Sequence, residues 1–150
     1  MISVTPSDPR ALERQFIEAF PALELRATIA SGAIFSDGDA RSACFRTDRP
    51  VFALEAKVRL SERKPLRASV SELRKAIAQL RRPGVIPLVV VYSVPRRSYT
   101  VTLLEDDARH LEDLGLEVGG LATRRQHLAM RVLREDEWLA LYRRIEQWSS

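Results

Sequence analysis

An ionisable pair interrupts an otherwise apolar stretch near the middle of the chain. Between Val51 and Val58 apolar residues recur at every second position, which predicts a β-strand with one face in the core. Glu55 and Lys57 fall on the other face of this strand. A carboxylate and an ammonium on a covered sheet face cost several kcal/mol unless they pair or bind a metal ion. The pair is therefore either a surface ion pair or part of a catalytic site.

A further acidic residue precedes the neighbouring predicted strand, which spans Ala40–Arg46 and leads into the first strand through a short turn. If Asp39 lies opposite Lys57 in this hairpin, then Asp39, Glu55 and Lys57 share one face of the sheet. A shift of one residue would place Asp39 on the opposite face, because strand side chains alternate. We adopt the first register.

In that register the hairpin offers ligands for a hard divalent cation. Asp39, Glu55 and the backbone carbonyl of Ala56 supply the oxygen atoms that Mg²⁺ prefers, and Mn²⁺ is expected to substitute. Asp37 has the same parity and is the alternative ligand, but Asp39 directly adjoins the strand. A bound Mg²⁺ polarises a phosphodiester and lowers the pKa of a bound water, while Lys57 holds that water or offsets transition-state charge. The predicted chemistry is phosphodiester hydrolysis without a covalent intermediate.

Composition narrows the class of protein. The chain has 150 residues, 45% of them hydrophobic, which suits one domain with a core of its own. One cysteine and two histidines make a disulfide framework or a zinc site improbable, and there is no glycine-rich phosphate loop. The net charge is +4, and only three of the 24 basic residues are lysine. Arginine suits phosphate groups and so favours a polyanionic partner, although GC-rich codon usage would give the same bias.

Element signals along the chain predict a mixed α/β fold, with a mixed central β-sheet flanked by helices. Ser69 and Glu72 form a capping box that opens a helix, and the apolar run Leu88–Tyr92 follows it as a strand covered on both faces. A strand, a helix and a second strand in this order predict a parallel crossover. The remaining expected elements are helices over 9–20, 106–114 and 135–148, strands over 23–28, 98–104 and 127–133, and a loop over 117–123.

The order of Glu13, Ser31, Asp39, Glu55 and Lys57 resembles the PD-(D/E)xK nuclease superfamily. Within it, Leu12–Phe16 is similar to the glutamate-bearing helix of archaeal-type Holliday junction resolvases, and Ala30–Ala33 to their serine-glycine loop. Phage-borne relatives are the most similar in layout. The resemblance implies a restriction-endonuclease-like αβββαβ core over about 9–104, in a single nuclease domain of 1–150 with a C-terminal extension over 105–150. Gly38 stands where the family has its nominal proline.

The resemblance also implies roles and partners. Glu13 would hold a metal-bound water or complete the metal shell, and Ser31 would contact the phosphate next to the scissile bond. The alternatives are a solvated helix residue for Glu13 and a turn former for Ser31. Four-way junctions are two-fold symmetric, so the implied partner is a second copy of the chain. Trp138 and Trp148 of the final helix would contribute to that interface or pack in the core.

The expected activity is Mg²⁺-dependent resolution of four-way DNA junctions, with no small-molecule cofactor. The alternatives are a nuclease acting on duplex or branched DNA, of restriction or repair type, and an inactive DNA-binding module. The sequence shows no signal peptide and no apolar run of ~18 residues, so we expect a cytoplasmic protein of a bacterial, archaeal or phage-infected cell. Basic and amide side chains that follow or flank the catalytic strand are expected to bind DNA: Arg26, Arg59, Arg63, Lys64, Arg67, Lys75, Gln79, Arg82, Arg96 and Arg97.

Overall fold

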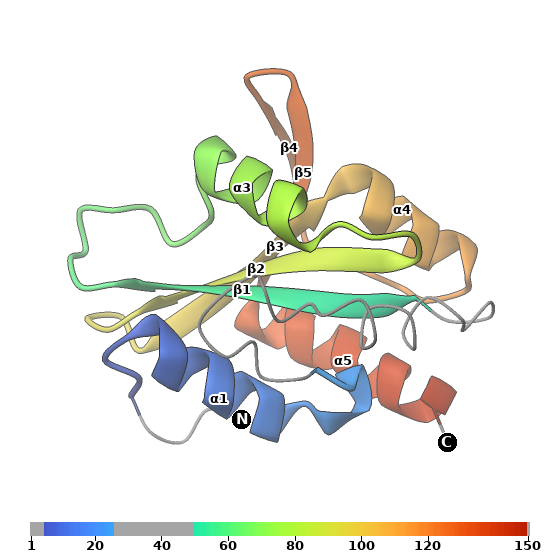
Figure 1. Ribbon diagram of the computed structural model, residues 1–150, viewed down its shortest axis with the longest axis horizontal. Helices are drawn as coiled ribbons and strands as arrows, with labels where there is room; N and C mark the ends of the chain where they lie inside the picture. Colours follow the sequence, from blue (N-terminus) through green and yellow to red (C-terminus); the bar gives the residue numbers. More distant parts are fainter. Residues whose placement is uncertain (1–4, 26–49, 150) are drawn as a thin grey trace.

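The computed structural model describes residues 5–25 and 50–149, and its centre is a five-stranded mixed sheet (Figure 1). The strands lie in the order β1-β2-β3-β5-β4. β1 and β2 are parallel, and every other neighbouring pair is antiparallel. The strand bounds are β1 Val51–Arg59, β2 Val85–Ser93, β3 Ser98–Leu104, β4 Leu121–Arg125 and β5 Leu128–Arg134. The expected mixed α/β class is therefore confirmed.

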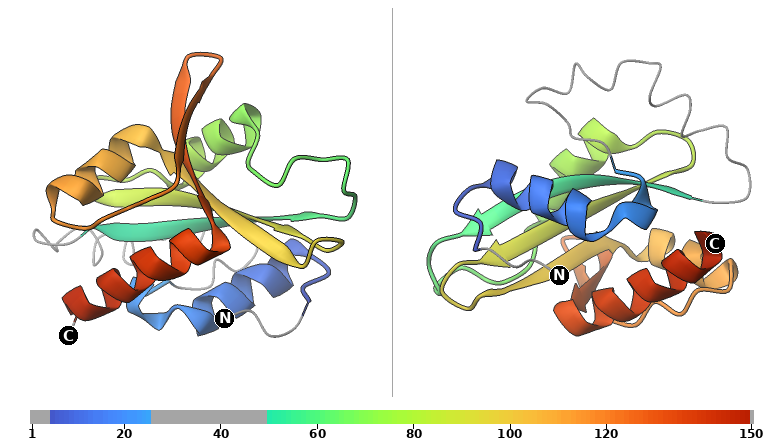
Figure 2. Two further views of the ribbon diagram at one scale, coloured as in Figure 1. Left: turned by 180° about the vertical axis from the view of Figure 1, so that it is seen from behind. Right: turned by 90° about the horizontal axis from the view of Figure 1, so that it is seen from below.

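Helices cover both faces of this sheet (Figures 1 and 2). The helix bounds are α1 Pro9–Ala19, α3 Val70–Leu80, α4 Glu105–Asp113 and α5 Glu135–Ser149, with a short 3₁₀ helix, η1, over Pro21–Leu23. α1 and α5 lie on one face and α3 on the other, while α4 packs near β3 and β5. Within the described residues no helix is both long enough and apolar enough to cross a membrane.

The parallel crossover formed by β1, α3 and β2 carries the candidate site. α3 begins where predicted, because the Ser69 hydroxyl accepts from the Glu72 amide while the Glu72 carboxylate accepts from the Ser69 amide. Every residue of β2 is buried, since α3 covers one face of the strand and the α1 and α5 layer covers the other. β1 is the outer strand of the described sheet next to β2.

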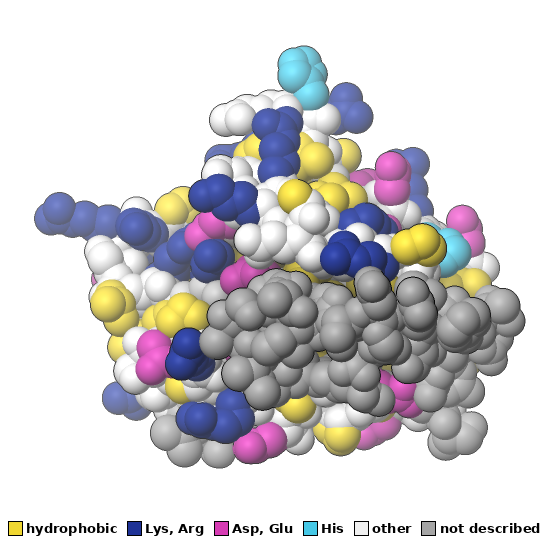
Figure 3. Space-filling model, viewed as in Figure 1, with side chains coloured by type: hydrophobic (Ala, Val, Ile, Leu, Met, Phe, Trp, Pro, Cys, Tyr) yellow, Lys and Arg dark blue, Asp and Glu magenta, His cyan; other side chains and the backbone are white. Residues whose placement is uncertain are grey.

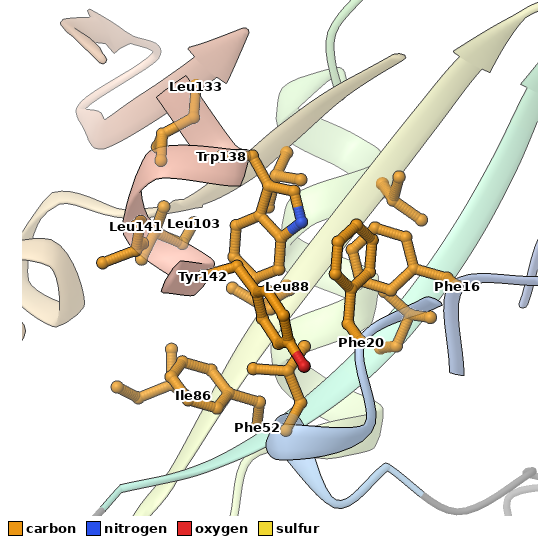
Figure 4. Close-up of a cluster of buried hydrophobic side chains, with 14 of the residues drawn as sticks. Phe16, Phe20, Phe52, Ile86, Leu88, Leu103, Leu133, Trp138, Leu141 and Tyr142 are labelled. Carbon is orange, nitrogen blue, oxygen red and sulfur yellow. The ribbon is translucent and has the colours of Figure 1, made fainter. Parts of the chain in front are cut away.

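Aromatic side chains join α1 to α5 beneath the sheet (Figure 4). Asp8 caps α1 and Pro9 opens it, so that Phe16 and the following Phe20 face the sheet. The Trp138 ring lies 5.5 Å from that of Phe16 and 5.6 Å from that of Phe20, and it is fully buried. Trp138 therefore packs in the core, as the second of the two alternatives predicted, and Trp148 lies partly buried against the same core.

Two predicted elements are wrong. Where a strand is predicted over 23–28, the described part forms η1 and then a left-handed turn at Glu24, because Leu23 turns into the core beside Phe20. The predicted loop over 117–123 ends at Gly120, and β4 then begins at Leu121 and pairs with β5. The predicted strand Ala40–Arg46 lies outside the described residues. Strands β4 and β5 continue the sheet, so the C-terminal segment shares the core of the preceding residues.

Candidate active site

Glu55 and Lys57 project from the same face of β1, as the alternation predicts. Their neighbour Ala53 packs in the cluster on the α3 side, whereas Leu54 and Ala56 pack in the α1 and α5 cluster. The two charged residues therefore face the α3 side of the sheet. Lys57 Nζ lies 3.8 Å from Glu55 Oε1, and the two side chains are 37% and 30% exposed. They form a loose, half-buried ion pair, open to a further ligand.

The surroundings of the Glu55 carboxylate disfavour its charge. Burial raises the pKa of Glu55; the Lys57 charge lowers it, and the negative charge of Glu13 raises it again. Glu13 belongs to α1, which packs against β1 from the opposite face of the sheet, so Lys57 and Glu13 both act on Glu55 electrostatically but from different sides. A carboxyl group with a raised pKa gains from a proton or a cation. Among the described residues, the charge that offsets this burial is the Lys57 ammonium.

The predicted ligand set lies partly outside the described residues. Asp39, Ser31 and Arg26 all belong to the segment 26–49 that the structure does not describe. Among described residues, no group of three or more His, Cys, Asp and Glu side chains could hold a metal ion. Glu55 and Glu13 are oxygen donors of the kind that suits Mg²⁺, and the methyl group of Ala56 is buried on the opposite face.

Arg59, at the end of β1, is engaged by protein groups. Its Nη1 and Nη2 donate to Glu72 at 2.8 and 2.5 Å, and Nη2 also donates to the carbonyl of Arg67. Burial raises the pKa of Glu72, but the Arg59 guanidinium outweighs it and lowers this pKa to about 2. The side chain of Arg59 is only 12% exposed. Arg59 therefore fastens β1 to α3, and its guanidinium is occupied in this structure.

The loop over 60–68 and the turn between β2 and β3 meet at the carboxyl end of the parallel strands. Arg96 Nη2 donates to the carbonyl of Glu62 at 3.1 Å, which places the two segments side by side. Arg63, Lys64 and Arg97 are exposed there, while Arg67 is half-buried. These basic residues of the predicted DNA surface thus gather at one end of the sheet, beside the site.

Lys75 and Gln79 lie on the side of α3 that faces β1. Glu72 precedes them by three and seven residues, so the three side chains share one side of the helix. Glu72 reaches Arg59 on β1, and this contact fixes the direction of that side. Lys75 and Gln79 are both exposed. Arg82 follows the end of α3, is half-buried and donates to the neighbouring carbonyl of Arg81.

Among the exposed arginines to which the sequence assigned no role, Arg74, Arg124 and Arg125 lie at the β4–β5 turn or beside it. Arg74 lies on the other side of α3, where Nη2 donates to the carbonyl of Gln126 at 2.9 Å. Arg124 and Arg125 are the last two residues of β4. The first residues of this strand were predicted to belong to the loop over 117–123. The consecutive pair of arginines before a two-residue turn was the available sequence signal.

Comparisons of the chain with protein-family models, curated proteins and solved structures found no match. The function is therefore argued from the site itself.

Proposed function

We propose that this chain is a metal-dependent endonuclease that cuts four-way DNA junctions, built on a restriction-endonuclease-like core. The observation that carries the proposal is the side-by-side placement of Glu55 and Lys57 on one face of β1. The parallel strand β2 and the connecting helix α3 behind them match the crossover of that core. Exposed basic residues at the adjoining end of the sheet supply a surface for the DNA backbone.

Each residue of the site has a proposed task. Glu55 would hold Mg²⁺ together with Asp39 and the carbonyl of Ala56, and Glu13 would orient a water or complete the shell. When bound, the ion supplies Lewis acidity to the phosphodiester and activates water. Lys57 Nζ, held near Glu55, donates hydrogen bonds to the attacking water or to the phosphate oxygens as negative charge builds. Ser31 would contact the phosphate beside the scissile bond.

A junction resolvase needs two active sites related by a two-fold axis, because two opposed strands must be cut. The proposed assembly is therefore a homodimer in the cytoplasm. Since Trp138 is enclosed by its own chain, the proposed interface lies elsewhere on the protomer.

The test is cleavage of a labelled, immobile four-way junction beside a linear duplex of the same sequence. The full chain is incubated with each in Mg²⁺, in Mn²⁺ and in EDTA. The expected result is paired nicks in opposed junction arms with either metal and no product in EDTA. Equal cutting of the duplex would replace the resolvase with a nuclease of restriction or repair type. Binding without cutting in both metals would replace it with an inactive DNA-binding module.

A further inference from the structure

The hairpin of β4 and β5 stands out from the body of the molecule (Figures 1 and 2). Four of the five residues of β4 are exposed, and only Thr123 is half-buried. Gln126 and His127 join the strands, and both have positive φ angles, of 47° and 65°. A two-residue turn of this kind fits the right-handed twist of paired strands and keeps a hairpin narrow. The result is a slender two-stranded ribbon with a tight, exposed tip.

Positive charge gathers at the tip of this ribbon. The sequence has no acidic residue from Leu121 to Arg134. Arg124 and Arg125 are exposed, and neither forms a salt bridge within the part of the chain that the structure describes. Arg74 of α3 adds a third cation beside the turn, through its bond to the Gln126 carbonyl. Figure 3 shows basic side chains over this hairpin and α3.

The base of the ribbon, in contrast, is firmly anchored. Arg131 of β5 donates to both carboxylate oxygens of Glu105 at 2.7 Å and to the carbonyl of Gly119 at 2.9 Å. Glu137 of α5 accepts from the Gly120 amide at 3.0 Å and from the Arg134 amide at 2.9 Å. The arginines near the base are thus paired, while Arg124 and Arg125 at the tip form no salt bridge with any described residue. Fixing the base lowers the ordering cost that a ligand would otherwise meet at the tip.

We propose that the β4–β5 hairpin is a DNA-binding arm whose tip lies in the major groove of duplex DNA. Paired strands are about 4.8 Å apart, and a major groove about 12 Å wide admits such a ribbon. Arg124 and Arg125 are consecutive in β4, so they point to opposite faces of the ribbon. In a groove, each of the two arginines would contact one of the two phosphate backbones that border it. A flat protein or lipid surface would contact only one of the two arginines.

The proposed arm adds a DNA-binding element to the proposed nuclease, and its substrate, junction DNA, is taken from that proposed function. β1 and β4 are at opposite edges of the described sheet, about 19 Å apart at ~4.8 Å per strand. Between them α3 carries Lys75 toward β1 and Arg74 toward the hairpin. The arm would hold a duplex arm of the substrate while the β1 site meets the scissile phosphate.

The experiment measures binding of the full chain to a labelled duplex and a labelled junction in EDTA, where no cutting occurs, at several salt concentrations. The test variant is Arg124→Gln with Arg125→Gln. The matched control is Arg143→Gln with Arg144→Gln, a second consecutive pair, on α5 across the sheet, that removes the same charge. We expect the arm variant to bind about tenfold or more weakly, with a log–log salt slope smaller by about 1.8. The control should stay within about threefold of the wild type.

Equal losses in the two variants, or an unchanged salt slope in the arm variant, would overturn the proposal. So would an equal loss of binding to poly-glutamate, since that would make the tip a general polyanion site. Arg124→Lys with Arg125→Lys should restore most of the affinity, which excludes a folding defect. The nuclease is tested separately, by incubating the wild-type chain with the labelled junction in Mg²⁺. A wild-type chain that binds through the arm without cutting would refute the nuclease and leave the arm in place.

Discussion

Two glutamate ion pairs in this molecule are built from similar residues and differ in almost every physical respect. Glu105, at the start of α4, receives two 2.7 Å hydrogen bonds from Arg131 and a third from Arg109. The Arg131 hydrogen bond, opposed by burial, lowers the pKa of Glu105. Within residues 5–25 and 50–149, the ion-pair partner of Glu55 is the ammonium of Lys57 at 3.8 Å, and burial raises the pKa of Glu55. Glu105 thus receives three arginine hydrogen bonds, whereas Glu55 has one distant ammonium among the described residues.

The difference shows what each pair can do. The planar fork of Arg131 matches the carboxylate of Glu105 and ties α4 to β5, which makes this network structural. A lysine ammonium is a point charge on a flexible stem, and it leaves lone pairs of Glu55 free for a cation. The two pairs have similar residue types, and they differ in pairing geometry and in the direction in which the pKa of the glutamate changes.

The largest expected effect is loss of cutting at the Glu55–Lys57 pair. Glu55→Gln and Lys57→Ala should each lower single-turnover junction cleavage in Mg²⁺ by about 10²–10³-fold or more, because metal binding and transition-state stabilisation are lost. Binding in EDTA should remain within a few-fold of the wild type. Glu112→Gln, at the exposed edge of the structural network, is the control and should cut normally. Cutting within tenfold of the wild type by both site variants would remove the site assignment.

At the Glu105–Arg131 pair, the expected effect of a substitution is a loss of stability. Glu105→Gln leaves Arg131, whose side chain is 11% exposed, with only the more distant and more exposed Glu112 carboxylate at 3.5 Å among its described ion-pair partners. The expected loss is about 2–4 kcal/mol of unfolding free energy, or roughly 5–12 °C in Tm. Thermal unfolding measures it, and cutting per folded molecule should be unchanged. Arg109→Gln, whose side chain is 71% exposed, should cost less than about 1 kcal/mol. A Glu105→Gln variant as stable as this control would show that the network contributes nothing.

Next to the candidate site, the Glu72–Arg59 ion pair makes a pH-dependent contribution to the free energy of unfolding. The pKa of Glu72 is about 2 in the folded chain and ordinarily 4.5, so its stabilisation is complete above about pH 4.5 and is lost as the pH falls toward 2. Glu72→Gln keeps an acceptor for the capping box but loses the charge. Urea unfolding should show a loss of about 2 kcal/mol at pH 7 and almost none near pH 2. A constant difference across this range would assign the effect to the cap instead.

Much of the fold follows from local signals in the sequence. The capping box at Ser69, the apolar run of β2 and the alternation in β1 each predict one element, and all three are present. β4 gives no such signal, because an exposed ribbon needs no apolar alternation. The 3₁₀ turn at Pro21–Leu23 arises from tertiary packing of Leu23 and Phe20, which short-range periodicity does not encode.

The candidate site divides in the same way. The strand period of two places Glu55 and Lys57 on one face, so their juxtaposition follows from the sequence. The engagement of Arg59 by Glu72 depends on how α3 crosses β1, and no spacing along the chain contains that information. The part of the site that depends on Asp39 and Ser31 remains a prediction, since both lie outside the described residues.

The smallest expected effect is a gain of stability in Glu55→Gln, whereas Glu105→Gln should lose stability. Since the pKa of Glu55 is raised, its ionised form destabilises the fold, and stability falls as the pH rises through that pKa. Glu55→Gln should therefore raise Tm by about 1–3 °C at pH 8, and the gain should vanish near pH 4. Added Mg²⁺ should raise Tm of the wild type and leave the variant unchanged, because only the wild type gains binding energy in the folded state. A variant less stable than the wild type at pH 8 would make Glu55–Lys57 a second structural pair and erase the contrast with Glu105.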